Sequence, residues 1–347
     1  MLPTAAGTHA PPAAVLCGLA GWVPSRVVTN EHLARRFDTD EAWIRTRTGI
    51  GSRHVVDPGQ ATSDLAVEAG HRALASAGVD GVDAVVVATT TPDRSCPATA
   101  PAVAARLGLT GAAAFDISAV CTGFVYGLAS SAGLIAAGVA GRVLLIGADT
   151  YSTIVDPLDR ANAILFGDGA GAVVLRAGHR DEPGALGHFD LGSDGAHEDL
   201  ITVAAGGSRQ RSLPGEPRRE DRHFAMRGKE VYRHAVTRMA ESARTTLSRA
   251  GWKTDDVDHF VPHQANLRIL HSVADDLGLP RERCLTHVES VGNTGAASIP
   301  LALADAADRQ VLQPGDRLLL TAFGGGLTWG SCLLTWPTLT RQQGTTP

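Results

Sequence analysis

The chain has 347 residues and a net charge of −5, with 44% hydrophobic and 19% charged residues. These proportions are typical of a folded globular protein and exclude a disordered or fibrous chain. The negative net charge argues against a broad attraction to nucleic acid. No linker rich in proline, glycine or serine interrupts the chain after its first dozen residues, so the length indicates two tightly joined halves.

The cysteines indicate a reducing compartment. Their number is odd, and no closely spaced pair occurs among positions 17, 96, 121, 284 and 332. This pattern fits neither a disulfide framework nor a structural zinc site, so we expect a cytoplasmic protein. The start of the chain lacks Lys, Arg and a long apolar run, so we expect no secretory signal and a loose tail over residues 1–13.

The segment 117–141 contains no charged residue and is long enough to cross a bilayer. Ala, Gly and Ser dominate it, and these residues do not drive insertion, so we expect no membrane span. A helix that is apolar all round is instead predicted to be buried on every side. Cys121 then lies near the start of a central helix, whose free N–H groups and positive dipole end favour the thiolate. The other interpretation of Cys121 is a small buried apolar residue.

An internal repeat runs through the chain. A helix, turn and strand around Asp83 have a counterpart around Asp258, and the apolar run after Gly141 has a counterpart after Gly315. Roughly 170–175 residues separate the members of each pair, as expected of a duplicated unit. Strands that alternate with helices predict an α/β fold, with a layered unit over residues 14–180 and a second one over 181–340. A pseudo-twofold axis should relate the two halves.

Three chemically reactive residues are expected to meet at the junction of these halves. Asn293 occupies in the second half about the place that Cys121 occupies in the first. His263 follows the predicted strand 258–261, at the carboxyl end where open α/β sheets place ligands. Taken singly, His263 also suits a structural histidine, and Asn293 suits an ordinary turn.

Two glycine-rich stretches and one basic cluster allow more than one interpretation. The stretch 167–175 lacks G-x-G-x-x-G spacing and runs into a strand, so a nucleotide cofactor is rejected. The stretch 323–330 follows a buried strand and offers backbone N–H groups to an oxyanion, or forms a packed turn. Five arginines between 209 and 222 form a solvated loop or an anion site, and the interspersed Glu220 and Asp221 favour the loop.

Taken together, these segments resemble the thiolase superfamily and specifically β-ketoacyl-acyl carrier protein synthase III, the condensing enzymes that start fatty acid and some aromatic polyketide chains. The resemblance extends from Ala14 to Trp336. It is carried, in order, by the segments 40–50, 115–126, 166–172, 261–269, 292–294 and 322–330. It implies a thiolase-like duplicated layered fold, α-β-α-β-α, and a homodimer.

The resemblance also implies a reaction. Cys121 attacks an acyl-CoA thioester while the N–H groups of Cys121 and Gly325 hold the oxyanion. Malonyl carried on acyl carrier protein then loses carbon dioxide, and His263 and Asn293 stabilise the enolate that attacks the acyl-cysteine. No metal or other cofactor is implied, since the CoA thioester is a substrate.

Further positions of the family fall on residues of this chain. The adenine of CoA is expected on Trp43, its phosphates near Arg47 and Arg160, and its pantetheine arm beside Asn266. A core anchor is the alternative for Trp43. Arg233 and Arg268 match positions that dock the acidic carrier protein, although exposed arginines often serve solubility alone.

Two positions depart from the family pattern. Cys96 stands where a bulky residue often reaches into the neighbouring subunit's acyl pocket, so we expect tolerance of branched or medium-chain acyl groups. Ala161 replaces a glycine that commonly follows the phosphate-binding arginine, which leaves that contact open.

Three other functions compete with the condensing activity that the resemblance implies. A biosynthetic thiolase needs a second reactive cysteine in the C-terminal glycine loop, which has none, and Cys332 falls several residues later in an apolar strand. An acyltransferase that moves the acyl group to a hydroxyl or amine without decarboxylation has no need of Asn293. A catalytically silent binding module is disfavoured because all three polar residues are present.

Overall fold

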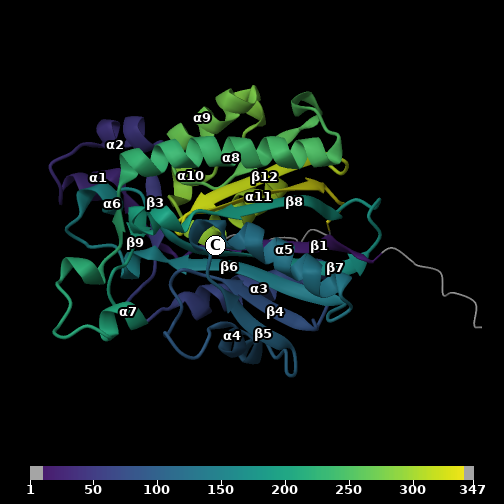
Figure 1. Ribbon diagram of the computed structural model, residues 1–347, viewed down its shortest axis with the longest axis horizontal. Helices are drawn as coiled ribbons and strands as arrows, with labels where there is room; N and C mark the ends of the chain where they lie inside the picture. Colours follow the sequence, from purple (N-terminus) through teal and green to yellow (C-terminus); the bar gives the residue numbers. More distant parts are fainter. Residues whose placement is uncertain (1–10, 340–347) are drawn as a thin grey trace, which may run out of the picture.

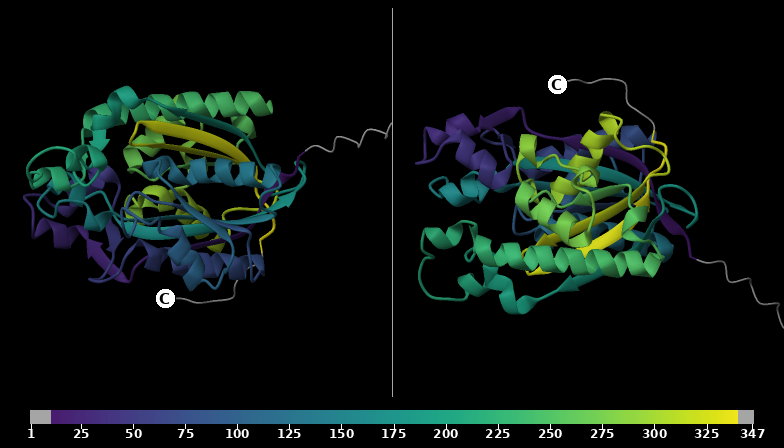
Figure 2. Two further views of the ribbon diagram at one scale, coloured as in Figure 1. Left: turned by 60° about the horizontal axis from the view of Figure 1, so that its bottom comes forward. Right: turned by 90° about the horizontal axis from the view of Figure 1, so that it is seen from above.

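Two β-sheets face each other, with helices between them and outside each of them (Figures 1 and 2). The computed structural model describes residues 11–339. The first sheet has the strand order β1-β7-β6-β4-β5 and the second has the order β11-β12-β13-β8. Their bounds are β1 Ala13–Trp22, β4 Ala84–Ala88, β5 Ala113–Ile117, β6 Arg142–Thr150, β7 Asp168–Gly178, β8 Leu186–Ser193, β11 His259–Pro262, β12 Arg317–Gly324 and β13 Thr328–Thr335.

The two sheets repeat one plan. β8, β13, β12 and β11 follow the order of β1, β7, β6 and β4, and Cys284 takes the place of β5 through a parallel bridge to Phe260. In the first sheet β6 is parallel to β4 and antiparallel to β7, and in the second β12 is parallel to β11 and antiparallel to β13. The predicted duplication and the layered α/β fold are therefore confirmed. Of the expected tail, residues 1–10 lie outside the described residues, and Ala13 already belongs to β1.

The helices form three layers around the sheets. α3 (Thr62–Ala77) and α4 (Ala100–Arg106) cover the outer face of the first sheet, and α8 (Gly228–Ala250) and α9 (Leu267–Leu277) cover the outer face of the second. Between the sheets lie α5 (Gly123–Ala136) and α11 (Ser298–Asp308), which share one apolar core with both of them. These layers give the α-β-α-β-α order.

The prediction for the uncharged segment 117–141 was partly wrong. Its first residue, Ile117, ends β5, and α5 begins only at Gly123. One face of α5 is buried, whereas Ser130, Gly133 and Ala136 are exposed. A helix without charged residues is suited to burial, but its sequence does not show whether residues of the same chain cover every face.

Short elements gather at the end of the sheets where the parallel strands have their carboxyl ends (Figure 1). They are α1 Asn30–Ala34, α2 Glu41–Thr48, α6 Arg160–Ala163, α7 Ser208–Arg211, α10 Val288–Val291, β2 Arg26–Thr29, β3 Ser52–Val55, β9 Ile201–Thr202 and β10 Ala225–Met226. This end of an α/β sheet is where ligands bind. Within residues 11–339, no helix combines the length and apolarity needed to cross a bilayer.

Candidate active site

Cys121 lies on the sharp turn that joins β5 to α5. A single 3-10 turn, Val120–Thr122, precedes the helix, and Val120 has a φ of +47°. A left-handed backbone is strained for a β-branched residue, and such strain concentrates at functional sites. The turn places the Cys121 side chain at the helix start, 8% exposed. The sequence predicted that Cys121 lies near a helix start, but it predicted neither the preceding strand nor the strain at Val120.

The electrostatics of Cys121 differ from the prediction. Burial and the nearby Asp149 raise the pKa of the Cys121 thiol to about 12, although the Tyr151 hydroxyl, 3.8 Å from the sulfur, partly offsets them. A rise of this size corresponds to about 4 kcal/mol, more than the roughly 0.3–2 kcal/mol that a helix terminus supplies. Burial therefore opposes the expected shift of Cys121 towards the thiolate and favours the thiol.

His263 follows β11 directly, as predicted. Its backbone N–H donates to the Thr321 carbonyl on β12, and its ring Nδ1 lies 2.7 Å from the Ser298 hydroxyl at the start of α11. Burial lowers the pKa of His263 to about 3, so the imidazole is neutral at physiological pH. With Nδ1 engaged, Nε2 is the ring atom that remains for a substrate.

Asn293 lies in the loop before α11, where two backbone hydrogen bonds fix it. Its N–H donates to the Leu165 carbonyl and its carbonyl accepts from Gly167, so the two chain segments pair as a short parallel bridge. Its side-chain oxygen accepts from the N–H of Gly295 at 3.0 Å. Because that oxygen is occupied, the NH₂ group is the end of the side chain that can serve a substrate.

A short series of contacts joins the three residues. A Cβ at Gly295 would come within 2.4 Å of the Tyr151 ring, so this glycine packs directly on the residue that contacts the Cys121 sulfur. The turn 295–297, which follows Asn293 and leads to Ser298, packs on the turn of Cys121, because a Cβ at Gly123 would lie 3.5 Å from Ala296. Cys121, His263 and Asn293 are therefore brought together at the seam between the halves.

The glycine loop after β12 closes one side of this seam. A Cβ at Gly324 would lie 2.8 Å from the backbone nitrogen of Cys121, so only glycine permits this approach. Gly325 is the next residue along the loop. The predicted proximity of this loop to Cys121 is thus observed, with Gly324 as the residue in direct backbone contact.

Comparison with known proteins assigns this arrangement to a family. Residues 115–195 match the family described as 3-oxoacyl-[acyl-carrier-protein] synthase III, and residues 247–336 match its C-terminal part. A β-ketoacyl-[acyl-carrier-protein] synthase III from Streptomyces coelicolor is 60% identical over 94% of this chain and 98% of its own. The chain belongs to the 3-oxoacyl-[acyl-carrier-protein] synthase III family.

Other members of the family agree with this assignment. A synthase III from Pseudomonas aeruginosa is 55% identical over 94% of this chain and 98% of its own. A crystal structure of synthase III from P. aeruginosa superposes with a TM-score of 0.89, at 53% identity over 95% of this chain and all of that chain. The priming β-ketosynthase of the R1128 polyketide pathway gives a TM-score of 0.86, at 35% identity over 96% of this chain and 99% of its own.

Trp43, on α2, lies between two arginines. Arg47 lies 5.7 Å and Arg160 lies 5.3 Å from the centre of the Trp43 ring, which is 38% exposed. The alternative of Trp43 as a core anchor is therefore wrong. Two segments more than a hundred residues apart meet here, as the expected adenine and phosphate contacts require.

Asn266 lies at the start of α9, close to the helix that carries Trp43. Its side-chain oxygen accepts from the N–H of Ile269 and caps α9. A Cβ at Gly49, which ends α2, would come within 2.4 Å of the Leu267 side chain, so α2 packs on the start of α9. Asn266 thus lies between the Trp43 helix and the segment of His263, and its NH₂ group remains for a ligand.

The remaining predicted positions are exposed. Arg233 lies on α8, and Arg268 lies on α9 with its guanidinium 5.9 Å from the ring of Tyr232. Cys96 is exposed in the loop after β4. The N–H of Ala161 donates to the Asp159 carboxylate, which caps α6, so this N–H is not available to a phosphate.

Most of the arginines between 209 and 222 form ion pairs on an exposed loop, which agrees with the loop interpretation. Arg218 pairs with Asp221, Arg219 with Asp156, and Arg222 with Glu216. These pairs neutralise three of the five arginines. The cluster therefore carries no site of its own.

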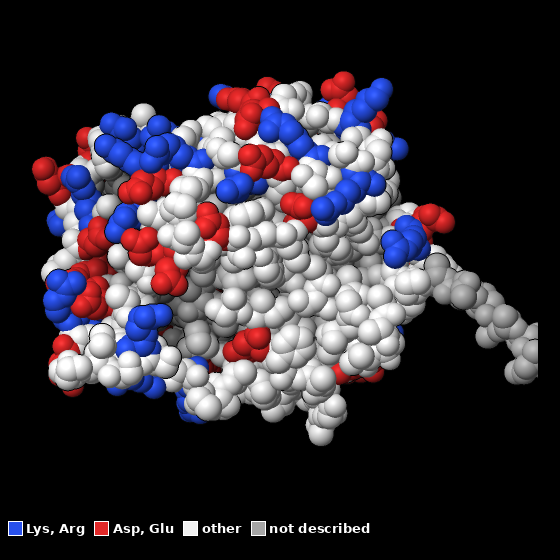
Figure 3. Space-filling view, viewed as in Figure 1, with Lys and Arg blue, Asp and Glu red and all other residues white. Residues whose placement is uncertain are grey.

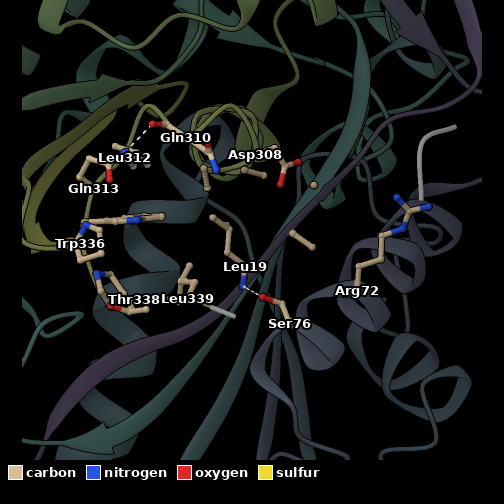
Figure 4. A pocket seen from close by; sticks show the side chains of 16 residues that line it. Leu19, Arg72, Ser76, Asp308, Gln310, Leu312, Gln313, Trp336, Thr338 and Leu339 are labelled. Carbon is tan, nitrogen blue, oxygen red and sulfur yellow. Dashed lines mark hydrogen bonds between the residues drawn. The ribbon is translucent and has the colours of Figure 1, made fainter. Parts of the chain in front are cut away.

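A cavity of about 540 Å³ lies away from the catalytic residues (Figure 4). Leu19 and Ser76 line it, together with Asp308 at the end of α11 and Trp336. Ser298, at the opposite end of α11, contacts His263, so the cavity lies about 15 Å away along the helix at 1.5 Å per residue.

Within residues 11–339, no group of three or more His, Cys, Asp or Glu side chains is arranged to hold a metal ion.

Proposed function

We propose that this synthase joins an acyl-CoA starter to malonyl-acyl carrier protein through an acyl group on Cys121. The observation that carries the proposal is a buried, neutral His263 and an oriented Asn293 amide on segments that pack against the turn of Cys121. A simple acyl transfer needs the thiol alone. Two uncharged hydrogen-bond donors next to it suit a step in which negative charge develops on a carbonyl oxygen.

In the first half-reaction, the Cys121 sulfur forms a bond to the acyl carbon and the bond from that carbon to the CoA sulfur breaks. The proton of the thiol ends on the departing CoA sulfur. Because the resting pKa of Cys121 is about 12, proton removal has to accompany the attack. The N–H groups of Cys121 and Gly325 hold the oxyanion of the tetrahedral intermediate, a role that the close approach of the glycine loop supports.

In the second half-reaction, malonyl thioester loses carbon dioxide and leaves an enolate. The Nε2–H of His263 and the NH₂ of Asn293 donate to its oxygen, and neither takes up its charge permanently. The enolate carbon then attacks the acyl group, the bond to the Cys121 sulfur breaks, and the sulfur regains a proton from water. The product is a 3-oxoacyl chain on the carrier. No metal or further cofactor is required by this scheme.

Exposed residues are assigned to the binding of CoA and of the carrier protein. Trp43 supports an adenine through stacking, and Arg47 and Arg160 supply charge for the phosphates of CoA. Arg233 on α8 and Arg268 on α9 are both exposed, which supports a contact with an acidic carrier protein.

We further propose that the chain acts as a homodimer. Figure 3 shows a broad uncharged surface over α5 and the strands below it. β5 is an edge strand of the first sheet, and its only charged residue, Asp116, is occupied in capping α4. An open apolar edge next to the uncharged face of a helix is suited to a second copy of the chain. Such a contact would complete the burial of α5.

The starter and the compartment are also proposals. Cys96 lies on an exposed loop and leaves space where the family often has a bulky residue, which supports branched or medium-chain starters. Either fatty acid or polyketide initiation accommodates such a starter. The five cysteines are unpaired, which supports a cytoplasmic location.

The release of carbon dioxide tests the proposed function. Purified protein loaded with acyl-CoA is expected to release labelled carbon dioxide from malonyl-acyl carrier protein and to form a 3-oxoacyl carrier in equal amount. Acyl transfer to a hydroxyl or amine acceptor without carbon dioxide would instead establish the non-decarboxylating acyltransferase.

A further inference from the structure

Tyr151 is a fully buried side chain that lies directly beside the Cys121 sulfur. It follows β6, and its hydroxyl lies 3.8 Å from Sγ. Among the described residues, it is the side chain with which the structure gives the Cys121 sulfur a hydrogen bond. The scheme above does not use this hydroxyl.

The Tyr151 ring is held in place from three sides. It stacks on Phe166, with centroids 4.5 Å apart, and meets the edge of Phe224 at 5.5 Å. Gly295 covers another part of the ring, at a distance that leaves no space for a Cβ. Aromatic pairs of this geometry contribute beyond their buried area, so the position of the hydroxyl is fixed by packing and not by the hydrogen bond itself.

The hydroxyl has two possible partners and a single hydrogen. In the structure it donates to the Thr90 hydroxyl at 3.3 Å, which leaves its lone pairs to accept from the Cys121 S–H. When the thiol loses its proton, a short rotation of the hydroxyl hydrogen turns it towards the sulfur. The exchange needs no movement of the ring.

We propose that Tyr151 is a positioning residue that holds the Cys121 sulfur and donates a hydrogen bond to it as the thiol loses its proton. Thr90 competes for that hydrogen and so restrains the effect. The inference rests on the proposed role of Cys121 as the nucleophile. It adds a specific donor to the step in which a deeply buried thiol has to be activated.

The surrounding charges make such a donor necessary. Burial raises the pKa of Cys121 and of Tyr151, and the nearby Asp149 on β6 adds to the rise for both. His263, across the seam, has a pKa of about 3 and carries no charge at neutral pH. Among the described side chains that act on Cys121, the Tyr151 hydroxyl is the one that lowers the pKa of the thiol.

The test is the alkylation rate of Cys121 by iodoacetamide, followed by mass spectrometry of the Cys121 peptide between pH 7 and 9. This reagent needs no CoA, so the result does not depend on the acyl-transfer proposal. Tyr151→Phe keeps the ring and is expected to slow alkylation about tenfold, because a hydrogen bond to a charged group is lost. Its rate profile should move about one unit towards higher pH. Acylation by acyl-CoA should fall by the same factor.

Two further variants separate this role from a structural one. Tyr232→Phe removes a hydroxyl that contacts Ser272, remote from the thiol, and is expected to alkylate at the wild-type rate. Thr90→Val removes the competing acceptor while it keeps the side-chain shape, and is expected to speed alkylation two- to threefold. Wild-type or faster alkylation of Tyr151→Phe, or slower alkylation of Thr90→Val, would overturn the proposal. Wild-type protein whose Cys121 is alkylated by iodoacetamide but is not acylated by acyl-CoA would contradict the reaction scheme and leave the role of Tyr151 to the alkylation rates.

Discussion

The ring nitrogen Nδ1 of His263 and the hydroxyl of Ser298, both in the second half of the chain, lie 2.7 Å apart. The Ser298 oxygen also accepts from the N–H of Gln264 at 3.3 Å, so its own hydrogen is free to point at Nδ1. We therefore assign the tautomer of His263 that carries its hydrogen on Nε2. Together with the pKa of about 3, this contact makes His263 a neutral donor and not a base.

Removal of either donor is expected to separate the two half-reactions. His263→Ala and Asn293→Ala should retain acylation of Cys121 within a fewfold, because neither side chain is needed for the first step. Release of carbon dioxide from malonyl-acyl carrier protein should fall by about 10²–10³, the usual effect of losing one donor to an oxyanion. Both rates are measured on the same preparations.

Ser298→Ala is the matched control for this division. It leaves both donors in place but removes the partner of Nδ1, so a smaller loss of decarboxylation, about tenfold, is expected. Acylation that disappears together with decarboxylation in the His263 and Asn293 variants would show that these side chains do not act on the enolate alone.

Asp149 predicts a particular pH dependence of stability. Its carboxylate accepts from the N–H groups of Thr90 and Ala296, but burial dominates and raises its pKa to about 7. Between its ordinary pKa of about 3.8 and this value, the folded protein holds a proton that the unfolded chain has lost. The contribution of this proton to the free energy of unfolding is therefore fully present below about pH 4. As the pH rises to about 7, the free energy of unfolding falls by about 4 kcal/mol.

The variant Asp149→Asn removes this titration and is measured by guanidinium unfolding at several pH values. Its own stability will fall, since an amide cannot accept both N–H groups equally well. The stability of the wild type relative to the variant should decline from pH 4.5 to pH 7.5. A difference between the two proteins that stays constant with pH would contradict the raised pKa.

The arginine-flanked Trp43 is expected to bind only the nucleotide end of the substrate. Trp43→Ala should raise the KM for acyl-CoA about tenfold, because one cation–π and stacking surface is lost. The KM for a short N-acetylcysteamine thioester, which lacks the nucleotide, should not change. Trp252→Ala removes a similar pair, with Arg317 at 5.1 Å, away from the site and serves as the control. Equal effects on both thioesters would argue against an adenine contact.

The exposed face of α5 gives a test of the proposed homodimer. A Cβ at Gly133 meets nothing within 4 Å, so Gly133→Arg is expected to fold and to place a charge on the uncharged surface. Light scattering should show a shift from dimer towards monomer. Ala75→Arg places the same charge on the exposed face of α3 and should remain dimeric. A wild-type mass for Gly133→Arg would exclude this face as the interface.

The fold and the positions of the three reactive residues could be predicted because local patterns determine them. The strand before His263 and the helix start near Cys121 are each visible over short stretches of sequence, and the internal repeat relates Cys121 to Asn293. Alternating strands and helices then fix the end of the sheet at which these residues meet.

The polar residues around the site could not be found in this way. Tyr151, Asp149 and Ser298 are single polar residues at the ends of apolar runs, and their partners come from distant segments. The position of Asp149 at the carboxyl end of β6 was a usable signal that the sequence interpretation did not take up. The thiol pKa was missed for the same reason, since a helix start is local whereas burial depends on the whole fold.

The central claim, that Cys121 carries the acyl group, is tested most directly by intact-protein mass spectrometry after exposure to a panel of acyl-CoAs without malonyl-acyl carrier protein. The account predicts a mass gain of one acyl group per chain, located on the Cys121 peptide and absent from Cys121→Ala that retains its thermal unfolding temperature. Acylation that persists in Cys121→Ala, or that maps to the exposed Cys96, would contradict it.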